Sequence, residues 1–169
     1  NVAPFFISHR KIIMTSHPRQ ELEARLALAE KIAREAGAKA LDYFKQRETL
    51  VIETKRDPQD VVSIADRDVE QLIRARVSEA FSQDGFLGEE YGLNEGTSGY
   101  TWVVDPIDGT SPFVNGMPNW CVSIAVLKDG EPVIGVIQAP CFDELYASAK
   151  GLGATLDGKK LVLDPSRTI

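Results

Sequence analysis

The first regular pattern along the chain is a set of apolar residues that recur at three- and four-residue steps between Pro18 and Phe44. Charged residues fill the positions between them, and Glu30 and Arg34 form a pair of opposite charge four residues apart. This spacing predicts one amphipathic helix over residues 18–44, with a possible bend at Gly37. Its expected buried stripe consists of Leu22, Leu26, Ala29, Ala33, Ala36, Ala40 and Phe44.

A strand, a loop and a second helix are expected next. The apolar and β-branched run from Leu50 to Thr54 predicts the strand, and the polar residues 55–60 predict the loop. The second helix is expected to begin near Ser63, because Asp66 follows three positions later in the arrangement of a capping box. The turn residues 83–85 should end this helix.

The second half of the chain changes to short apolar runs separated by turn residues. Lys128-Asp129-Gly130 predicts a tight hairpin between two of these runs. Helices followed by consecutive hairpins favour an α+β fold, with helices packed on a mostly antiparallel sheet, over a doubly wound parallel sheet. The expected strands are Tyr100–Val104, Trp120–Leu127, Pro132–Gln138, Leu145–Ala149 and Leu161–Leu163.

Composition narrows the class of protein. The 169 residues are 43% hydrophobic and 26% charged, which is the balance of a folded globular domain. A net charge of −6 opposes binding to a nucleic acid polymer, and no apolar run reaches the roughly 18 residues of a membrane span. Two cysteines without a C-x-x-C pair favour a reducing compartment, so the cytoplasm is expected. A change in composition at Met14 suggests that residues 1–13 are an upstream extension. The expected division is an N-terminal extension over residues 1–17 and a domain over residues 18–169.

The segment with the most chemical content is WVVDPIDGT, residues 102–110. It reads as a buried strand that presents Asp105 and Asp108 at its carboxyl end, followed by a glycine turn. Asp-Pro and Asp-Gly are also common turn dipeptides, so an ordinary loop explains the same residues. The spacing alone leaves both interpretations open.

A second pair of carboxylates, Glu89 and Glu90, follows another short apolar run. Oxygen donors without histidine or cysteine suit Mg²⁺, which binds through one or two carboxylates and keeps several waters. Such a site would handle phosphate. The competing interpretation is a solvated acidic loop.

Three segments together resemble the inositol monophosphatase family of Mg²⁺-dependent phosphomonoesterases: GEE, WVVDPIDGTSPFVNGMPNWCVSIAV and GVIQAPCFDELYASAKGLGATLDGKKL. The resemblance runs from Leu22 to Val162 and implies the N-terminal part of that family's layered sugar-phosphatase fold. It also implies catalysis by metal-activated water, in which Thr110 orients the water and Glu89 takes part. Backbone N–H groups of Gly109 and Thr110 would hold the phosphate. The implied metal ligands are Glu89, Asp105, the Ile107 carbonyl and Asp108.

Two further residues carry competing interpretations. Asp66 is either the third residue of a capping box or, by the resemblance, an acid that polarises Thr110 and binds an additional metal. Lys55 in the polar loop is either solvated or, as in the family, a lysine that approaches the active site. Trp120 and Cys121 are expected to serve the core or an interface.

The expected function is hydrolysis of a small phosphomonoester, with inositol monophosphate as the first candidate and histidinol phosphate as the alternative. Family members are longer, and the W-D-x-A motif of their second half has no match in this chain. A non-catalytic metal-binding half-domain is therefore a rival interpretation, with little turnover expected of these residues alone. Unpaired strands and apolar faces further predict a homo-oligomer.

Overall fold

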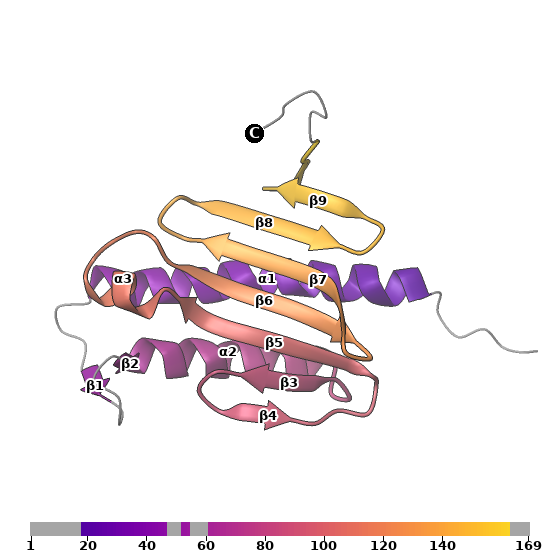
Figure 1. Ribbon diagram of the computed structural model, residues 1–169, viewed down its shortest axis with the longest axis horizontal. Helices are drawn as coiled ribbons and strands as arrows, with labels where there is room; N and C mark the ends of the chain where they lie inside the picture. Colours follow the sequence, from indigo (N-terminus) through magenta and orange to yellow (C-terminus); the bar gives the residue numbers. More distant parts are fainter. Residues whose placement is uncertain (1–17, 47–51, 55–60, 163–169) are drawn as a thin grey trace, which may run out of the picture.

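The computed structural model describes residues 18–46, 52–54 and 61–162. Its two long helices, α1 (Pro18–Lys45) and α2 (Ile64–Ala80), pack together on one face of an eight-stranded sheet (Figure 1). Helix α1 covers strands β6 to β8, and α2 covers β5. The predicted α+β arrangement of helices on a mostly antiparallel sheet is confirmed.

Neighbouring strands in the large sheet follow the order β10-β9-β8-β7-β6-β5-β3-β4. All of these neighbours pair antiparallel except β3 and β5, which run parallel. A separate antiparallel pair is formed by β1 (Ile52–Thr54) and β2 (Val61–Ser63). The large sheet contains β3 (Gly85–Gly88), β4 (Gly92–Asn94), β5 (Tyr100–Asp108), β6 (Cys121–Lys128), β7 (Glu131–Ala139), β8 (Glu144–Ala149), β9 (Gly153–Leu156) and β10 (Lys159–Lys160).

Helix α1 forms where the apolar spacing predicts it and continues through Gly37. A Cβ at this position would meet the Cγ atom of Gln138 on β7 at 2.7 Å. The glycine therefore permits close approach of the helix to the sheet, and it produces no break in the helix.

The core lies between the helices and one face of the sheet. Along β6, Val122, Ile124 and Val126 are buried against the helices, and the intervening residues lie on the opposite face. Within the described part of the chain no helix covers that opposite face, where Ile137 is 44% exposed and Tyr146 is 37% exposed. The sheet is thus buried on one side, as period-two alternation requires.

The hairpin predicted at Lys128-Asp129-Gly130 is present. Lys128 pairs with Glu131, and the two turn residues Asp129 and Gly130 have φ angles of 51° and 86°. Positive φ at both positions is typical of the type I′ turn that matches the twist of a hairpin.

The strand predicted at Leu161–Leu163 is wrong for its described residues, because Leu161 and Val162 lie outside any strand. The edge of the sheet is formed earlier, by β9 and β10, which a turn at Asp157-Gly158 connects. The pairs there are Lys159 with Leu156 and Lys160 with Thr155, so most of the paired residues are polar and apolar content was a poor guide to this edge. Among the described helices, none has the length and apolar character needed to cross a membrane.

Candidate active site

The strand predicted to end at Val104 continues to Asp108, so both aspartates of the central motif belong to the end of β5. The pairing of β5 with β6 shifts register between Asp105, opposite Ser123, and Asp108, opposite Cys121. In a regular strand, side chains three positions apart point to opposite faces of the sheet. The irregularity changes that alternation, and Asp105 and Asp108 come close enough to interact electrostatically.

The parallel pairing of β3 with β5 brings Glu89 to the same place. Gly88, the last residue of β3, pairs with Val104, so Glu89 and Asp105 are the next residues of two adjacent parallel strands. Figure 1 shows both strands pointing toward the side of the sheet where α3 (Thr110–Val114) lies and α2 begins, with β3 ending before β5 does.

Asp105 has an unusual electrostatic environment. Burial is the largest cause that raises its pKa, and the negative charges of Glu89 and Asp108 raise it further, to about 7. The Ile107 N–H donates a hydrogen bond to Asp105 Oδ1 at 3.2 Å, which opposes this rise. Three carboxylates therefore interact through their charges at one edge of the sheet.

Within the described part of the chain, no group of three or more His, Cys, Asp or Glu side chains forms a ready cluster for a metal ion. The donor chemistry nevertheless fits Mg²⁺, which needs only one or two carboxylates and retains several waters. The negative charges of Glu89 and Asp108 repel that of Asp105, and a bound divalent cation would reduce this repulsion.

The loop after β5 has a constrained backbone. Gly109 adopts φ +101°, and a Cβ at this position would meet the carbonyl oxygen of Asn119 at 2.8 Å. The Thr110 hydroxyl donates a hydrogen bond to the carbonyl oxygen of Ile107 at 3.2 Å. Thr110 and the Ile107 carbonyl, which the sequence assigned to one site, are therefore in direct contact.

Asp66 lies in the first turn of α2 and is 4% exposed. It is the third helical residue after Ser63, which is the spacing that a capping box requires. The side chain of Ser63 and the loop carrying Lys55 lie outside the described residues. Both interpretations of Asp66, and the role of Lys55, stay predictions.

Comparison with known proteins decides the family. Residues 21–168 match the inositol monophosphatase family. The chain belongs to that family.

Relatives within the inositol monophosphatase family include enzymes with different names. A histidinol-phosphatase of Chlorobaculum parvum is 42% identical over 133 residues, covering 79% of this chain and 51% of the relative. An inositol-1-monophosphatase of Bacillus subtilis is 38% identical over 136 residues, covering 79% of this chain and 51% of the relative. The chain thus spans about half the length of the curated relatives it matches.

Solved structures of the family show the same fold. The extragenic suppressor protein SuhB of Bartonella henselae superposes with a TM-score of 0.80 at 34% identity, covering 85% of this chain and 56% of that one. An inositol monophosphatase of Thermotoga maritima superposes with a TM-score of 0.76 at 28% identity, covering 85% and 55% of the two chains.

Glu70 is a residue whose importance the sequence did not reveal. It is fully buried on α2, and its Oε2 atom accepts a hydrogen bond of 2.7 Å from the N–H of Glu90. Its Oε1 atom accepts a hydrogen bond of 2.9 Å from Arg74. Glu70 therefore holds the turn that carries Glu89. The A-D-x-x-x-E spacing of residues 65–70 was the only signal, and that pattern is weak on its own.

Gly88 completes this arrangement. A Cβ at Gly88 would lie 2.0 Å from Glu70 Oε1, well inside van der Waals contact. The glycine of the G-E-E segment is therefore needed so that the buried carboxylate can reach the backbone of the next residues.

An aromatic cluster supports the loop from the side of α1. The rings of Phe113 and Trp120 meet edge to face at 4.9 Å, and Phe44 lies 5.4 Å from each. Trp120 is 3% exposed, in accord with the core role expected for it. Cys121 lies closer to the chemistry than expected, with its Sγ atom 3.9 Å from Asp108 Oδ2. Burial and the Asp108 charge raise the pKa of this thiol to about 11.

Proposed function

We propose that the protein containing this chain hydrolyses a small phosphomonoester and uses Mg²⁺ as its cofactor. The observation that carries the proposal is the electrostatic interaction of Asp105 with Glu89 and Asp108, where β3 ends beside the last part of β5. Membership of the inositol monophosphatase family supports it independently.

The residues proposed to hold Mg²⁺ are Glu89, Asp105, Asp108 and the carbonyl of Ile107. When bound, the cation neutralises charge on the phosphate and lowers the pKa of a coordinated water into the neutral range. The chain supplies the rest. Thr110, anchored at the Ile107 carbonyl, orients the water, and Asp66 supports that orientation.

The phosphate is proposed to lie against the N–H groups of Gly109 and Thr110. The absence of a side chain at Gly109, together with its left-handed backbone, lets an anion approach the main chain closely. This arrangement places the phosphate next to the carboxylates that hold the cation.

Inositol monophosphate is the first candidate substrate and histidinol phosphate the second. Relatives bearing both names reach 42% identity, so similarity alone does not choose between them. Phosphate release from inositol 1-phosphate, histidinol phosphate and adenosine 3',5'-bisphosphate should be measured on the full-length protein with and without Mg²⁺. We expect Mg²⁺-dependent release that is fastest with inositol 1-phosphate.

Two results of this panel would change the proposal. Faster release from histidinol phosphate would reassign the substrate and keep the chemistry. Calorimetric binding of Mg²⁺ without release from any of the three substrates would instead favour the non-catalytic metal-binding role.

We further propose that the protein acts in the cytoplasm as a homo-oligomer. Both cysteines, Cys121 and Cys141, are free thiols, which suits a reducing compartment. The partly exposed apolar sheet face around Ile137 and Tyr146 supports self-association. A purely monomeric mass in light scattering at micromolar concentration would contradict the oligomer.

A further inference from the structure

A cavity lies at the other end of the sheet from the carboxylates of the candidate active site. Its volume is about 370 Å³, within the range of small-molecule sites, and it opens between the start of α1 and the strand ends around β5 and β7. Tyr100 of this cavity and Asp108 of the candidate active site are the two ends of β5, which has nine residues. At about 3.3 Å per residue, the two places are roughly 25 Å apart.

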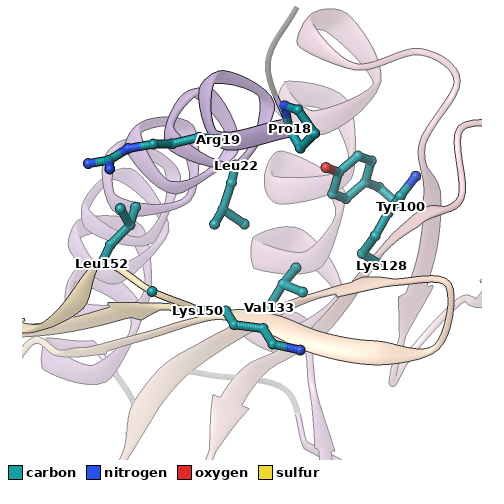
Figure 2. Close-up of a pocket in the computed structure, with 9 residues that line it drawn as sticks. Pro18, Arg19, Leu22, Tyr100, Lys128, Val133, Lys150 and Leu152 are labelled. Carbon is teal, nitrogen blue, oxygen red and sulfur yellow. The ribbon is translucent and has the colours of Figure 1, made fainter.

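The body of the cavity is apolar. Figure 2 shows Leu22 from α1, Val133 from β7 and Leu152 from the turn after β8 pointing toward the same space. Pro18 and the ring of Tyr100 close it at the top and at one side. An apolar ligand would shield these side chains from water.

The mouth of the cavity is basic. Lys128 and Lys150 line it, and no aspartate or glutamate is among the lining residues. In the part of the chain that the structure describes, the ammonium group of Lys150 has no ion-pair partner, while its backbone N–H is bonded to the Val133 carbonyl at 2.9 Å. The third basic residue, Arg19, points away from the cavity and pairs with Glu23 at 2.8 Å.

Lys128 is held in place by its surroundings. Its Nζ atom donates a hydrogen bond of 2.9 Å to the Ser98 carbonyl and lies 4.3 Å from the centre of the Tyr100 ring. Asp129 lies 3.9 Å from the same Nζ atom and offsets part of its charge. Lys150 is therefore the cation with the most charge available for a ligand.

We propose that this cavity binds a small amphiphile with an apolar tail and one carboxylate head. The tail would lie against Leu22, Val133 and Leu152, and the carboxylate would meet Lys150 at the mouth. Inorganic phosphate lacks the apolar part and would gain little from this cavity. The site is thus separate in place and in ligand chemistry from the proposed phosphomonoester site.

Octanoate is a suitable probe, and methyl NMR on the full-length protein reports both its affinity and its position. We expect octanoate to shift the methyl signals of Leu22, Val133 and Leu152. Octan-1-ol, with the same tail and no charge, and octylammonium, with the opposite charge, should bind at least fivefold more weakly. Lys150→Glu should weaken octanoate binding by about tenfold, because it replaces attraction by repulsion.

The matched control is Lys31→Glu, which makes the same charge change at an exposed position of α1 outside the cavity. It should alter octanoate affinity by less than twofold, and Lys150→Arg should retain binding. Absence of binding, equal affinity for octan-1-ol, or shifts confined to the open sheet face around Ile137 would each overturn the proposal. Binding that appears only after deletion of residues 1–17 would also overturn it, since the cavity would then belong to the chain's own N-terminal segment.

Discussion

Glu70 illustrates how one buried charge can position a site that it does not belong to. Its side chain is fully buried, and it accepts hydrogen bonds from Glu90, Tyr91 and Arg74. Each partner lies on the segment around Glu89 or on the next turn of α2. Since a buried carboxylate is stabilised only while it is paired, the conformation of the Glu89 turn depends on the hydrogen bonds that Glu70 accepts.

Glu70→Gln should therefore weaken Mg²⁺ binding while the protein remains folded. The amide keeps the volume but loses the charge, and one of its ends cannot accept a hydrogen bond. We expect about a tenfold loss of Mg²⁺ affinity in calorimetry and a loss of roughly 2 kcal/mol of stability in urea unfolding. Glu79→Gln, at an exposed position of the same helix, is the control and should change neither quantity. Unaltered Mg²⁺ affinity in Glu70→Gln would show that the turn carrying Glu89 keeps its conformation without the Glu70 carboxylate.

Burial and acidic neighbours disfavour the ionised form of the Asp105 carboxyl group. Replacing Asp105 should therefore weaken metal binding without lowering the stability of the metal-free protein. Asp105→Asn should abolish the rise in melting temperature on adding Mg²⁺ and leave the metal-free melting temperature unchanged or higher. Differential scanning calorimetry measures both, with Asp143→Asn in an exposed turn as the control. If Asp105→Asn kept the full response to Mg²⁺, Asp105 would not be a ligand.

At the scale of elements, the site depends on two irregular features of an otherwise simple sheet. One is the parallel pairing of β3 with β5, and the other is the register shift near the end of β5. The glycines at these places provide room: Gly88 for the Glu70 carboxylate and Gly109 for the Asn119 backbone. Small additions at either glycine should thus disturb the site more than the sheet.

Gly88→Ala tests this at the first position. The added methyl group would overlap the Glu70 carboxylate, which must move away from the Glu90 N–H. We expect a loss of about 1–3 kcal/mol of stability, in the range of overpacked cores, with most of the Mg²⁺ affinity lost as well. Gly135→Ala on β7 is the matched control, since its Cβ would make only ordinary contact with Ser148 at 3.5 Å. Equal effects of the two substitutions would argue against a special role for Gly88.

For the whole molecule, a buried polar link joins α1 to the turn before β3 and to β5. Arg25 binds Asp84 through two hydrogen bonds of 2.8 Å, and Asp84 also accepts bonds from Ser98 and from the indole N–H of Trp102. Burial alone would raise the pKa of Asp84, but these donors and the Arg25 charge outweigh it and lower the pKa. The carboxylate is therefore charged in the folded protein over the whole neutral range.

This link predicts a specific dependence of stability on pH. Because the folded-state pKa of Asp84 lies below its value of about 3.9 in the unfolded chain, its contribution is present above that pH and is lost as the pH falls through the folded-state pKa. Asp84→Asn should cost about 3 kcal/mol at pH 7 and reduce the acid sensitivity of unfolding between roughly pH 4 and pH 2. Asp129→Asn, in the exposed turn, should leave the urea midpoint at both pH values unchanged. A parallel acid profile in Asp84→Asn and the parent would refute the assignment.

The sequence predicts most elements of this molecule because their patterns are local. The apolar stripe of α1 and the Asp129-Gly130 turn each depend on neighbouring residues, and both are confirmed. The burial of Glu70 and its hydrogen bonds to the Glu89 turn could not be predicted from such patterns, because a charged residue on a helix normally faces water. The proximity of Asp105 to Asp108 depends on a register shift with β6, which no spacing within β5 encodes. Strands β9 and β10 were not predicted because their residues are largely polar or small.

The parallel pairing of β3 with β5 has a consequence for how cation binding is coupled to folding. Strands β5 to β9 each pair antiparallel with the next strand along the chain. The pairing of Gly88 with Val104 instead passes over the intervening strand β4, and this pairing brings Glu89 beside Asp105. A cation that binds the assembled carboxylates would then favour chains that have formed this pairing over collapsed chains that have not. Ion binding would in this way stabilise the correct strand order of the sheet over incorrect ones.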